Sequence, residues 1–191
     1  MSRIPTVIFG GSFDPIHKGH LALAEEVCRR RLADEVWFLV SPQNPHKAAG
    51  NLTPEGLRLQ MVALAVGDNP SFKACDFEFS LPRPSYTVNT LAALRDTFPN
   101  REFILLIGAD NWAKFDKWYK WEEILSLYKI IVYPRGKESS PHLPKGVIWI
   151  DAPLYDISST QVREIVASGG DASSLLSPGV CDFIKKNGLY K

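Results

Sequence analysis

Two histidines three residues apart, His17 and His20, stand in the segment "VIFGGSFDPIHKGHL" near the start of the 191-residue sequence. Residues at this spacing lie one turn apart on the same face of a helix. The segment leaves an apolar run through Gly10 and Gly11 and passes an Asp-Pro turn signal, so the histidines fall where a helix begins. Backbone N–H groups and the positive end of the helix dipole favour an anion there, and two imidazoles add donors. The pattern predicts a phosphate-binding site.

The same segment is open to other interpretations. For the glycines alone, a tight strand-to-helix turn explains the sequence as well as close ligand approach does, because both use the freedom of a residue without Cβ. A His-x-x-His pair can also belong to a metal site, but the pair is not a complete ligand set, and no cysteine or further histidine lies near it in the sequence. Phosphate binding is therefore favoured over metal ligation. The Walker A and dinucleotide-binding glycine patterns are both absent.

A second segment, "YDISSTQVREIVASGG", has the start signals of a helix and one residue that those signals leave unexplained. Ser158 and Gln161 form an S-x-x-Q capping box, which accounts for both of them. Arg163 follows in the first turns, where a cation lies at the unfavourable end of the helix dipole. A bound polyphosphate would be a better partner for it than the neighbouring Glu164. We therefore expect two helix N-termini, one with histidines and one with hydroxyls and an arginine, to hold a triphosphate together.

Together, "GGSFDPIHKGHL" and "ISSTQVR" resemble the paired signature of the HxGH nucleotidyltransferase superfamily. Within it, the sequence closely resembles the bacterial nicotinate-nucleotide adenylyltransferases, and the likeness extends over nearly the whole chain. It continues through "NPHK", "PSYTVNTL", "LIGADN", "KWYKWEEI" and "VCDFIKKNGLY". The resemblance implies transfer of AMP from ATP to nicotinic acid mononucleotide, which yields deamido-NAD and pyrophosphate for NAD biosynthesis. Because the attacking phosphate oxygen is already anionic, alignment and charge stabilisation suffice and no protein nucleophile is required.

The same resemblance implies which residues form the site. His17, His20 and Arg163 are expected to be catalytic, with His20 nearest to the transferred phosphorus. The residues expected to bind ATP are Gly10, Gly11, Ser12, Phe13, His17, His20, Lys47, Asp110, Ile157, Ser158, Ser159, Thr160 and Arg163. The residues expected to bind the nicotinate nucleotide are Ser12, Lys47, Arg58, Tyr86, Thr87, Asp110, Trp118, Tyr119 and Arg135. Mg²⁺ is expected to arrive on the ATP phosphates, without a dedicated set of protein ligands.

Several of these positions also have a purely structural interpretation. Lys47 and Arg58 could each be a solvated surface charge, and Thr87 could serve only as the N-cap of a helix. Trp118 falls at helical spacing with other apolar residues, so it could belong to the core instead of stacking on the pyridine ring. Arg135 stands in "YPRG", whereas related sequences often have "RPG" after the corresponding strand. Its register toward the substrate phosphate is therefore open.

Three other functions share parts of this pattern. Pantetheine-phosphate adenylyltransferases share the "GSFDP" opening and a serine-rich "ISS" motif, but they usually have threonine in place of the first histidine and are shorter. Nicotinamide mononucleotide as the acceptor differs only by an amide in place of a carboxylate, and the sequence does not place the few groups that would distinguish them. A non-catalytic nucleotide sensor on the same fold is the alternative outside the enzymes. The intact histidine pair together with Arg163 speaks against it.

The elements that must position these residues follow an alternating pattern. Short apolar runs are separated by stretches of helical period, which is typical of βαβ units. Strands are expected at residues 6–9, 35–40, 72–79, 102–107, 129–133 and 147–150. Helices are expected at residues 19–32, 54–66, 87–97, 118–127, 158–167 and 178–186. We predict an α/β fold: a Rossmann-like, doubly wound, mostly parallel sheet with helices on both faces, whose ligands bind beyond the carboxyl ends of the strands.

Composition and charge narrow the remaining possibilities. The chain is 45% hydrophobic with a net charge of +1, so it lacks the excess of positive charge that nucleic-acid binding requires. Its three cysteines are far apart in the sequence, as in proteins of a reducing compartment. The first residues lack a signal-peptide layout, and no apolar run approaches the roughly 20 residues of a membrane span. We expect one cytoplasmic nucleotidyltransferase domain over residues 1–191, with a C-terminal helical part at about 156–191.

Overall fold

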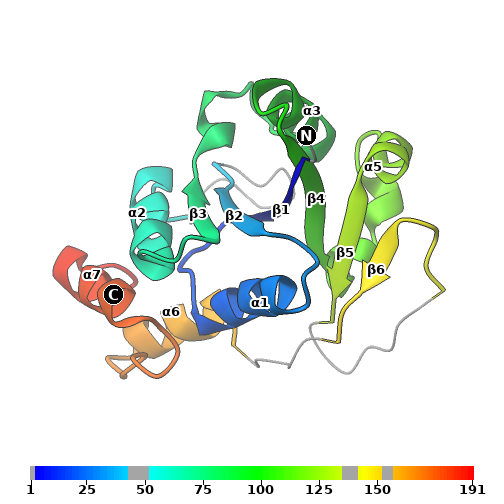
Figure 1. The fold of residues 1–191 in the computed structure, drawn as a ribbon. Helices are drawn as coiled ribbons and strands as arrows, with labels where there is room; N and C mark the ends of the chain where they lie inside the picture. The colour runs from blue at the N-terminus through cyan, green and yellow to red at the C-terminus, as the bar shows by residue number, and fades with distance from the viewer. Residues whose placement is uncertain (1–2, 43–51, 135–141, 152–156) are drawn as a thin grey trace.

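The computed structural model describes residues 3–42, 52–134, 142–151 and 157–191 of the chain. Its central element is a six-stranded sheet with the order β3-β2-β1-β4-β5-β6, in which every neighbouring pair is parallel (Figure 1). The strands are β1 (Ile4–Gly11), β2 (Glu35–Val40), β3 (Phe72–Cys75), β4 (Arg101–Gly108), β5 (Lys129–Tyr133) and β6 (Val147–Trp149). The predicted Rossmann-like, doubly wound fold is confirmed.

Helices follow the strands on both sides of this sheet (Figure 1). The α-helices are α1 (Lys18–Arg29), α2 (Glu55–Val66), α3 (Thr87–Thr97), α4 (Ala109–Trp112), α5 (Trp121–Leu127), α6 (Ser159–Ala167) and α7 (Pro178–Asn187). Two short 3₁₀-helices, η1 (Phe77–Ser80) and η2 (Phe115–Lys117), lie in the connections. Within the described residues, no helix has both the length and the apolar character that a bilayer crossing needs.

One face of the sheet packs against the helices that follow the two predicted phosphate motifs. Side chains alternate between the faces of a strand, and Phe9 of β1 and Phe38 of β2 point to this side. They belong to one buried cluster with Val27 of α1, Val62 of α2 and Val162 of α6, and α7 extends the same layer (Figure 1). Each such fully buried apolar side chain contributes about 1.5–3 kcal/mol of transfer free energy. The core therefore holds α1 and α6 on the same side of the sheet.

The opposite face packs against α3 and α5. The intervening strand residues, such as Ile8 and Trp37, point to this side and form a second buried cluster with Leu91 of α3 and Ile124 of α5. From β1 the chain thus runs outward to β2 and β3 through α1 and α2 on one face. From β4 it runs outward to β5 through α5 on the other face. β1 and β4 are neighbours in the sheet, so their connections diverge to opposite faces. A crevice is expected beyond the carboxyl ends of strands at such a switch point.

Residues 72–79, expected as one strand, form two different elements. β3 ends at Cys75, and η1 follows from Phe77. In a continuous strand Phe77 and Phe79 would share a face, because side chains alternate with a period of two. In the structure Phe79 packs against the cluster beneath α1, whereas Phe77 packs against the cluster beneath α3. The 3₁₀ turn lets the two rings be partly buried on opposite sides of the sheet, which a strand would not allow.

The helix expected at residues 118–127 begins later, at Trp121. Lys120, its N-cap, has a left-handed backbone conformation with φ of 52°, which interrupts the helical course before that point. Trp118 therefore lies in the connection after η2, outside the helix. The two rings therefore do not share one helix face, yet both pack, partly buried, against the cluster beneath α3 and α5, so the core interpretation of Trp118 holds in part.

Candidate active site

A cleft of about 200 Å³ opens at the carboxyl edge of the sheet. It is lined by the ends of four strands, represented by Gly10 of β1, Leu39 of β2, Gly108 of β4 and Tyr133 of β5. The α3 N-terminus and the connection after η2 line its other side, through Tyr86, Thr87, Trp118 and Tyr119. The cleft therefore lies at the switch point between β1 and β4, and it brings together residues of several predicted motifs.

The connection between β1 and α1 forms the end of the cleft nearest to the histidines. The left-handed residue in it is Phe13, with φ of 47°, and neither Gly10 nor Gly11 has a positive φ. At Gly11 a Cβ would lie 3.0 Å from the Phe13 ring, so any larger residue there would have to displace the ring slightly. At Gly10 a Cβ would meet nothing within 4 Å, so this glycine leaves open space in the cleft. A ligand can thus approach the β1 backbone closely at Gly10.

The two histidines lie at the N-terminus of α1, where His17 is the N-cap. The His17 backbone N–H donates to Nδ1 of His20 at 3.2 Å, and the two rings stack with centroids 3.7 Å apart. The His20 ring also packs edge-on against Phe13, with centroids 5.1 Å apart. Because Nδ1 of His20 accepts this bond, a neutral His20 carries its proton on Nε2. The structure thus holds His20 as a hydrogen-bond donor in one orientation.

The N-terminus of α6 lies directly beside this loop, as the paired motifs predicted. Ser158 is the N-cap, and its Oγ accepts from the Gln161 backbone N–H at 3.1 Å. Ser159 Oγ donates to the Pro15 carbonyl at 2.9 Å, which joins α6 to the β1–α1 connection. The contact is made across 144 residues of sequence. Two positive helix ends are therefore held side by side, an arrangement that favours an anion with several charges.

Arg163 makes the second link between α6 and the loop. Its Nη1 donates to the Asp14 carbonyl at 2.7 Å, and its Nη2 donates to Thr160 Oγ1 at 3.2 Å. The half-buried guanidinium therefore has partners in the protein itself, in addition to any that a ligand would supply. Planar arginine forks of this kind suit bidentate contacts to phosphate oxygens.

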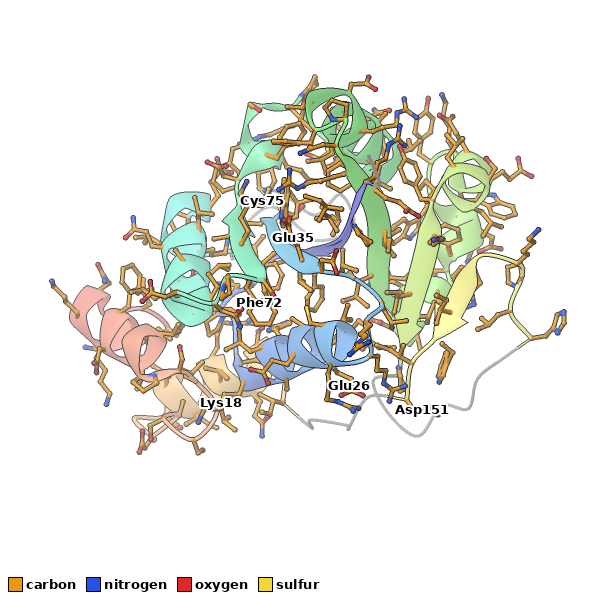
Figure 2. All side chains as sticks on the ribbon, in the orientation of Figure 1. Lys18, Glu26, Glu35, Phe72, Cys75 and Asp151 are labelled. Atoms are coloured by element: carbon orange, nitrogen blue, oxygen red, sulfur yellow. The ribbon has the colours of Figure 1, made fainter. Side chains whose placement is uncertain are left out.

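Lys18, between the two histidines, faces away from this arrangement. Its Nζ donates to the carbonyl of Ser174 at 2.8 Å, and its backbone N–H donates to the carbonyl of Leu175 at 2.9 Å. Figure 2 shows Lys18 at the end of α1 nearest to α6, in the direction of the α6–α7 connection. Lys18 thus fastens α1 to the C-terminal part of the chain.

The other end of the cleft is aromatic. The rings of Tyr86 and Tyr119 are tilted by 44° with centroids 4.9 Å apart, and 39% and 51% of these residues are exposed. Trp118 lines the cleft and also packs against Phe115, with centroids 5.4 Å apart. Thr87 is the first residue of α3 and Tyr86 is its N-cap, so the interpretation of Thr87 as the cap is wrong. This end offers ring faces, a phenol pair and a hydroxyl to a flat ligand.

A buried carboxyl group, which the sequence reasoning missed, lines the same cleft. Glu78 of η1 is 6% exposed, and its carboxyl accepts from Ser41 Oγ at 2.8 Å and from Thr90 Oγ1 at 2.9 Å. Burial raises the pKa of the Glu78 carboxyl, while the two hydroxyls partly oppose the rise. The glutamate within "FKACDFEF" was a possible signal, since a charged residue between phenylalanines is unusual in a buried strand. Ser85 and Asn111, also missed, line the cleft as well.

Arg58 lies beneath the cleft and not in it, which corrects its predicted contact with the substrate phosphate. The side chain is 1% exposed. Its guanidinium donates to four backbone carbonyls, those of Ser12, Ser41, Pro42 and Thr53, at 2.6–3.2 Å. Burial in this position lowers the pKa of the arginine. Because the donors are engaged with the backbone, Arg58 fastens α2 to the ends of β1 and β2, and it is not a surface charge either.

The remaining predicted residues differ in how far the structure places them. Lys47 and Arg135 lie outside the described residues. Asp110 lies on α4 with an exposed side chain, and it is the next residue, Asn111, that lines the cleft. Ile157 is half-buried and packs against the core beneath α1. In the part of the chain that the structure describes, no group of three or more histidine, cysteine or acidic side chains is arranged to hold a metal ion.

Comparison with known proteins gives a consistent result at three levels. The family model described as cytidylyltransferase-like matches residues 8–165. A protein of Bacteroides fragilis named "Probable nicotinate-nucleotide adenylyltransferase" is 50% identical over 182 residues, which cover 94% of this chain and 90% of the relative. A Bacteroides thetaiotaomicron protein of the same name is 46% identical over 187 residues, which cover 97% of this chain and 93% of the relative.

The solved structures of similar fold include a nicotinic acid mononucleotide adenylyltransferase of Plasmodium falciparum. Its complex with NaAD has a TM-score of 0.82 to this chain at 21% identity, with 98% of both chains covered. Its complex with APC has a TM-score of 0.81 at 22% identity, with the same coverage. At this identity the likeness bears on the fold, and it agrees with the strand order described above.

Proposed function

This chain belongs to the nicotinate-nucleotide adenylyltransferase family, and we propose that its cleft transfers AMP from ATP to nicotinic acid mononucleotide. The observation that carries the proposal is the composition of the cleft. Gly10, Gly11 and Ser12 of the nucleotide loop line it together with Tyr86 and Thr87 of "PSYT", whereas His17, His20 and the α6 residues lie outside its lining. A dinucleotide product would extend from one end to the other. Nicotinic acid adenine dinucleotide and pyrophosphate are the expected products.

The ATP phosphates would lie at the paired N-termini of α1 and α6. Ser159 and Arg163 hold these termini together through the carbonyls of Pro15 and Asp14, so the anion site is assembled before ATP arrives. Pre-assembled donors need little reorganisation when charge develops on the phosphates. The hydroxyl of Thr160, next to the Arg163 guanidinium, is a further donor on the same helix turn.

The chemical step would be an in-line displacement at the α-phosphorus of ATP. A phosphate oxygen of the mononucleotide forms the new P–O bond, and the bond from the α-phosphorus to the oxygen of the departing pyrophosphate breaks. No proton has to be removed from the nucleophile at neutral pH. His20 would donate from Nε2 to a phosphate oxygen as negative charge shifts, with its ring held by the His17 backbone and by Phe13.

Mg²⁺ would accompany ATP, with phosphate oxygens and water as its ligands. The Asp14 carboxyl in the nucleotide loop accepts from Tyr190. When bound, the ion would neutralise part of the charge on the departing pyrophosphate. The protein residues supply alignment and hydrogen bonds around it.

The aromatic end of the cleft would receive the nicotinate ring. Trp118 and Tyr119 offer ring faces for stacking, and Thr87 at the first turn of α3 offers a hydroxyl next to free backbone N–H groups. A carboxylate is favoured at such a helix end.

We also propose that the enzyme is cytoplasmic. Its three cysteines, Cys28, Cys75 and Cys181, are free thiols, which is typical of proteins in a reducing compartment.

The experiment that tests the proposal measures pyrophosphate release from Mg·ATP with three acceptors in separate reactions. These are nicotinic acid mononucleotide, nicotinamide mononucleotide and phosphopantetheine. We expect a strong preference for the first. Turnover only with phosphopantetheine would keep the phosphate site and overturn the acceptor. ATP binding without turnover on any acceptor would favour a nucleotide sensor.

A further inference from the structure

A hydrogen bond joins the far end of the sequence to the nucleotide loop. The phenol of Tyr190 donates to Oδ1 of Asp14 at 2.6 Å, across 176 residues of sequence. The approach of the tyrosine depends on the turn after α7, where Gly188 and Tyr190 have positive φ values of 61° and 65°. In this turn the Leu189 backbone N–H donates to the Ile184 carbonyl at 3.1 Å. A non-glycine residue with positive φ requires compensation, and the bond to Asp14 supplies it at Tyr190.

Asp14 is a junction of three segments. Its carbonyl accepts from Arg163 of α6 at 2.7 Å, and its carboxyl accepts from Tyr190 and, at 3.4 Å, from the Thr53 backbone N–H. The residue is 3% exposed. A buried carboxylate is costly unless donors compensate it, so the tyrosine hydroxyl is a main support of the Asp14 position. Asp14 in turn stands three residues before His17 in the loop.

The tyrosine keeps its proton in this setting. Burial and the neighbouring Asp14 carboxylate both raise the pKa of the Tyr190 phenol well above its usual range. The hydroxyl is therefore a donor throughout the pH range in which the protein works. The hydroxyl also lies 4.0 Å from Met61 Sδ of α2, so it is positioned between α2 and the loop.

We propose that Tyr190 is a positioning residue for ATP binding. Tyr190 acts through Asp14. Its phenol donates to the Asp14 carboxyl, and the backbone carbonyl of Asp14 accepts from the Arg163 guanidinium. Without the phenol, the Asp14 carboxyl loses one of its hydrogen-bond donors. Asp14 then no longer holds Arg163 and the turn that leads to His17 in fixed positions. The inference deepens the proposed function, because it concerns the ATP end of that cleft and does not depend on which acceptor is used.

The test compares Tyr190→Phe with Tyr128→Phe. Tyr128 is a matched control, because it is a buried tyrosine of the opposite face whose hydroxyl has no partner among the described residues. The dissociation constant of Mg·ATP is measured by calorimetry without any acceptor. We expect it to rise about 10-fold in Tyr190→Phe, as the loss of a hydrogen bond to a buried charged group predicts, and to stay within twofold in Tyr128→Phe.

Steady-state kinetics with the working acceptor separate a positioning role from a general loss of stability. Tyr190→Phe should raise KM for ATP while KM for the acceptor stays within twofold. A lower Tm with an unchanged ATP dissociation constant would overturn the proposal, as would an equal rise in both KM values. Asp14→Asn alters the same bond from its acceptor side. The effects of Asp14→Asn and Tyr190→Phe on ATP binding should be strongly non-additive, and simple additivity would also overturn the proposal.

ATP binding alone carries this test, so its outcome is separable from that of the acceptor experiment. A protein that fails with all three acceptors but loses ATP affinity in Tyr190→Phe would keep the positioning role and lose the proposed reaction. A protein that turns over nicotinic acid mononucleotide with unchanged ATP affinity in Tyr190→Phe would keep the reaction and lose the positioning role.

Discussion

The imidazole rings of His17 and His20 lie stacked, with centroids 3.7 Å apart and planes inclined by 30°. The backbone N–H of the first histidine donates to Nδ1 of the second, so one residue orients the other. The pair is therefore an ordered unit at the start of α1. Its orientation is set by the protein and does not have to be created by the ligand.

The first prediction concerns His20. Substitution His20→Ala removes the Nε2 donor, and we expect kcat to fall by about 100- to 1,000-fold, as loss of a donor that stabilises developing charge does. Pyrophosphate release at saturating ATP is the measurement. His142→Ala, at an exposed position, is the matched control and should leave kcat unchanged. A folded His20→Ala enzyme with near-normal turnover would refute the assigned role.

Arg163 allows a prediction about fork geometry. In Arg163→Lys the positive charge remains, but one ammonium cannot reproduce the two bonds to Asp14 and Thr160. We expect KM for ATP to rise about 10-fold in Arg163→Lys and further in Arg163→Ala. The exposed Arg95→Lys serves as control. Equal KM values for wild type and Arg163→Lys would show that charge alone is sufficient there.

Two tryptophans make a matched pair for the aromatic end of the cleft. Trp112 and Trp118 both pack against Phe115, with centroids 5.1 and 5.4 Å away, but only Trp118 lines the cleft. We expect Trp118→Ala to raise KM for nicotinic acid mononucleotide about 3- to 10-fold through lost stacking, with KM for ATP unchanged. Trp112→Ala should lower stability without this effect. If both variants change KM for the acceptor alike, Trp118 contributes packing and not recognition.

Arg58 leads to a prediction about stability. Arg58→Met leaves four backbone carbonyls without the donor of a buried guanidinium, so we expect the free energy of unfolding to fall by about 3–5 kcal/mol. Urea denaturation measures it. Arg83→Met is the control, since Arg83 forms an exposed ion pair with Glu55, and such pairs contribute about 0–1 kcal/mol. A stable Arg58→Met protein with a raised KM for the mononucleotide would restore the original expectation of a substrate contact.

Glu78 predicts a pH dependence of stability. Burial raises the pKa of its carboxyl in the folded state, so the folded protein retains the proton at pH values where the unfolded chain has lost it. The contribution of the Glu78 carboxyl to the free energy of unfolding is therefore present at low pH. It is lost as the pH rises through the pKa that this carboxyl has in the folded protein. Glu78→Gln cannot titrate. We expect its free energy of unfolding, relative to wild type, to increase from pH 4.5 upward in urea denaturation.

The control for this series is Glu122→Gln, at an exposed position of α5. A constant difference between Glu78→Gln and wild type across the pH range would mean that the carboxyl titrates alike in the folded and unfolded states. A falling difference would mean that the Ser41 and Thr90 hydroxyls outweigh burial.

The parts of the structure that could be predicted from the sequence depend on neighbouring residues. The Ser158 cap of α6, the helix start at the histidines and the central strands follow from spacing, turn signals and apolar runs, all within a few residues. The pairing of the α1 and α6 N-termini also follows from the sequence, because Arg163 is unfavourable at a helix N-terminus without a bound anion. The structure provides an acceptor, the Asp14 carbonyl.

The parts that could not be predicted depend on distant segments. Arg58 reads as a surface cation in its helix, and only the carbonyls of Ser12 and Ser41, brought there by β1 and β2, make its burial favourable. In the sequence, Glu78 is typical of the end of a strand. Its hydrogen bond to Thr90 of α3, which comes from a distant segment of the fold, is not visible there. Phe13 takes the left-handed conformation expected of a glycine, because its ring is buried beneath Gly11.

The bond between Asp14 and Tyr190 has a consequence for the order in which the protein is made. Synthesis on the ribosome proceeds from the N-terminus at about 5–20 residues per second, and domains begin to fold as they emerge. Asp14 is synthesised before Tyr190, which is added 176 residues later. A nascent chain can therefore contain every strand of the described sheet, the last of which ends at Trp149, before the aspartate receives its phenol. Nascent chains that stop short of Tyr190 would be folded in large part but would bind ATP more weakly.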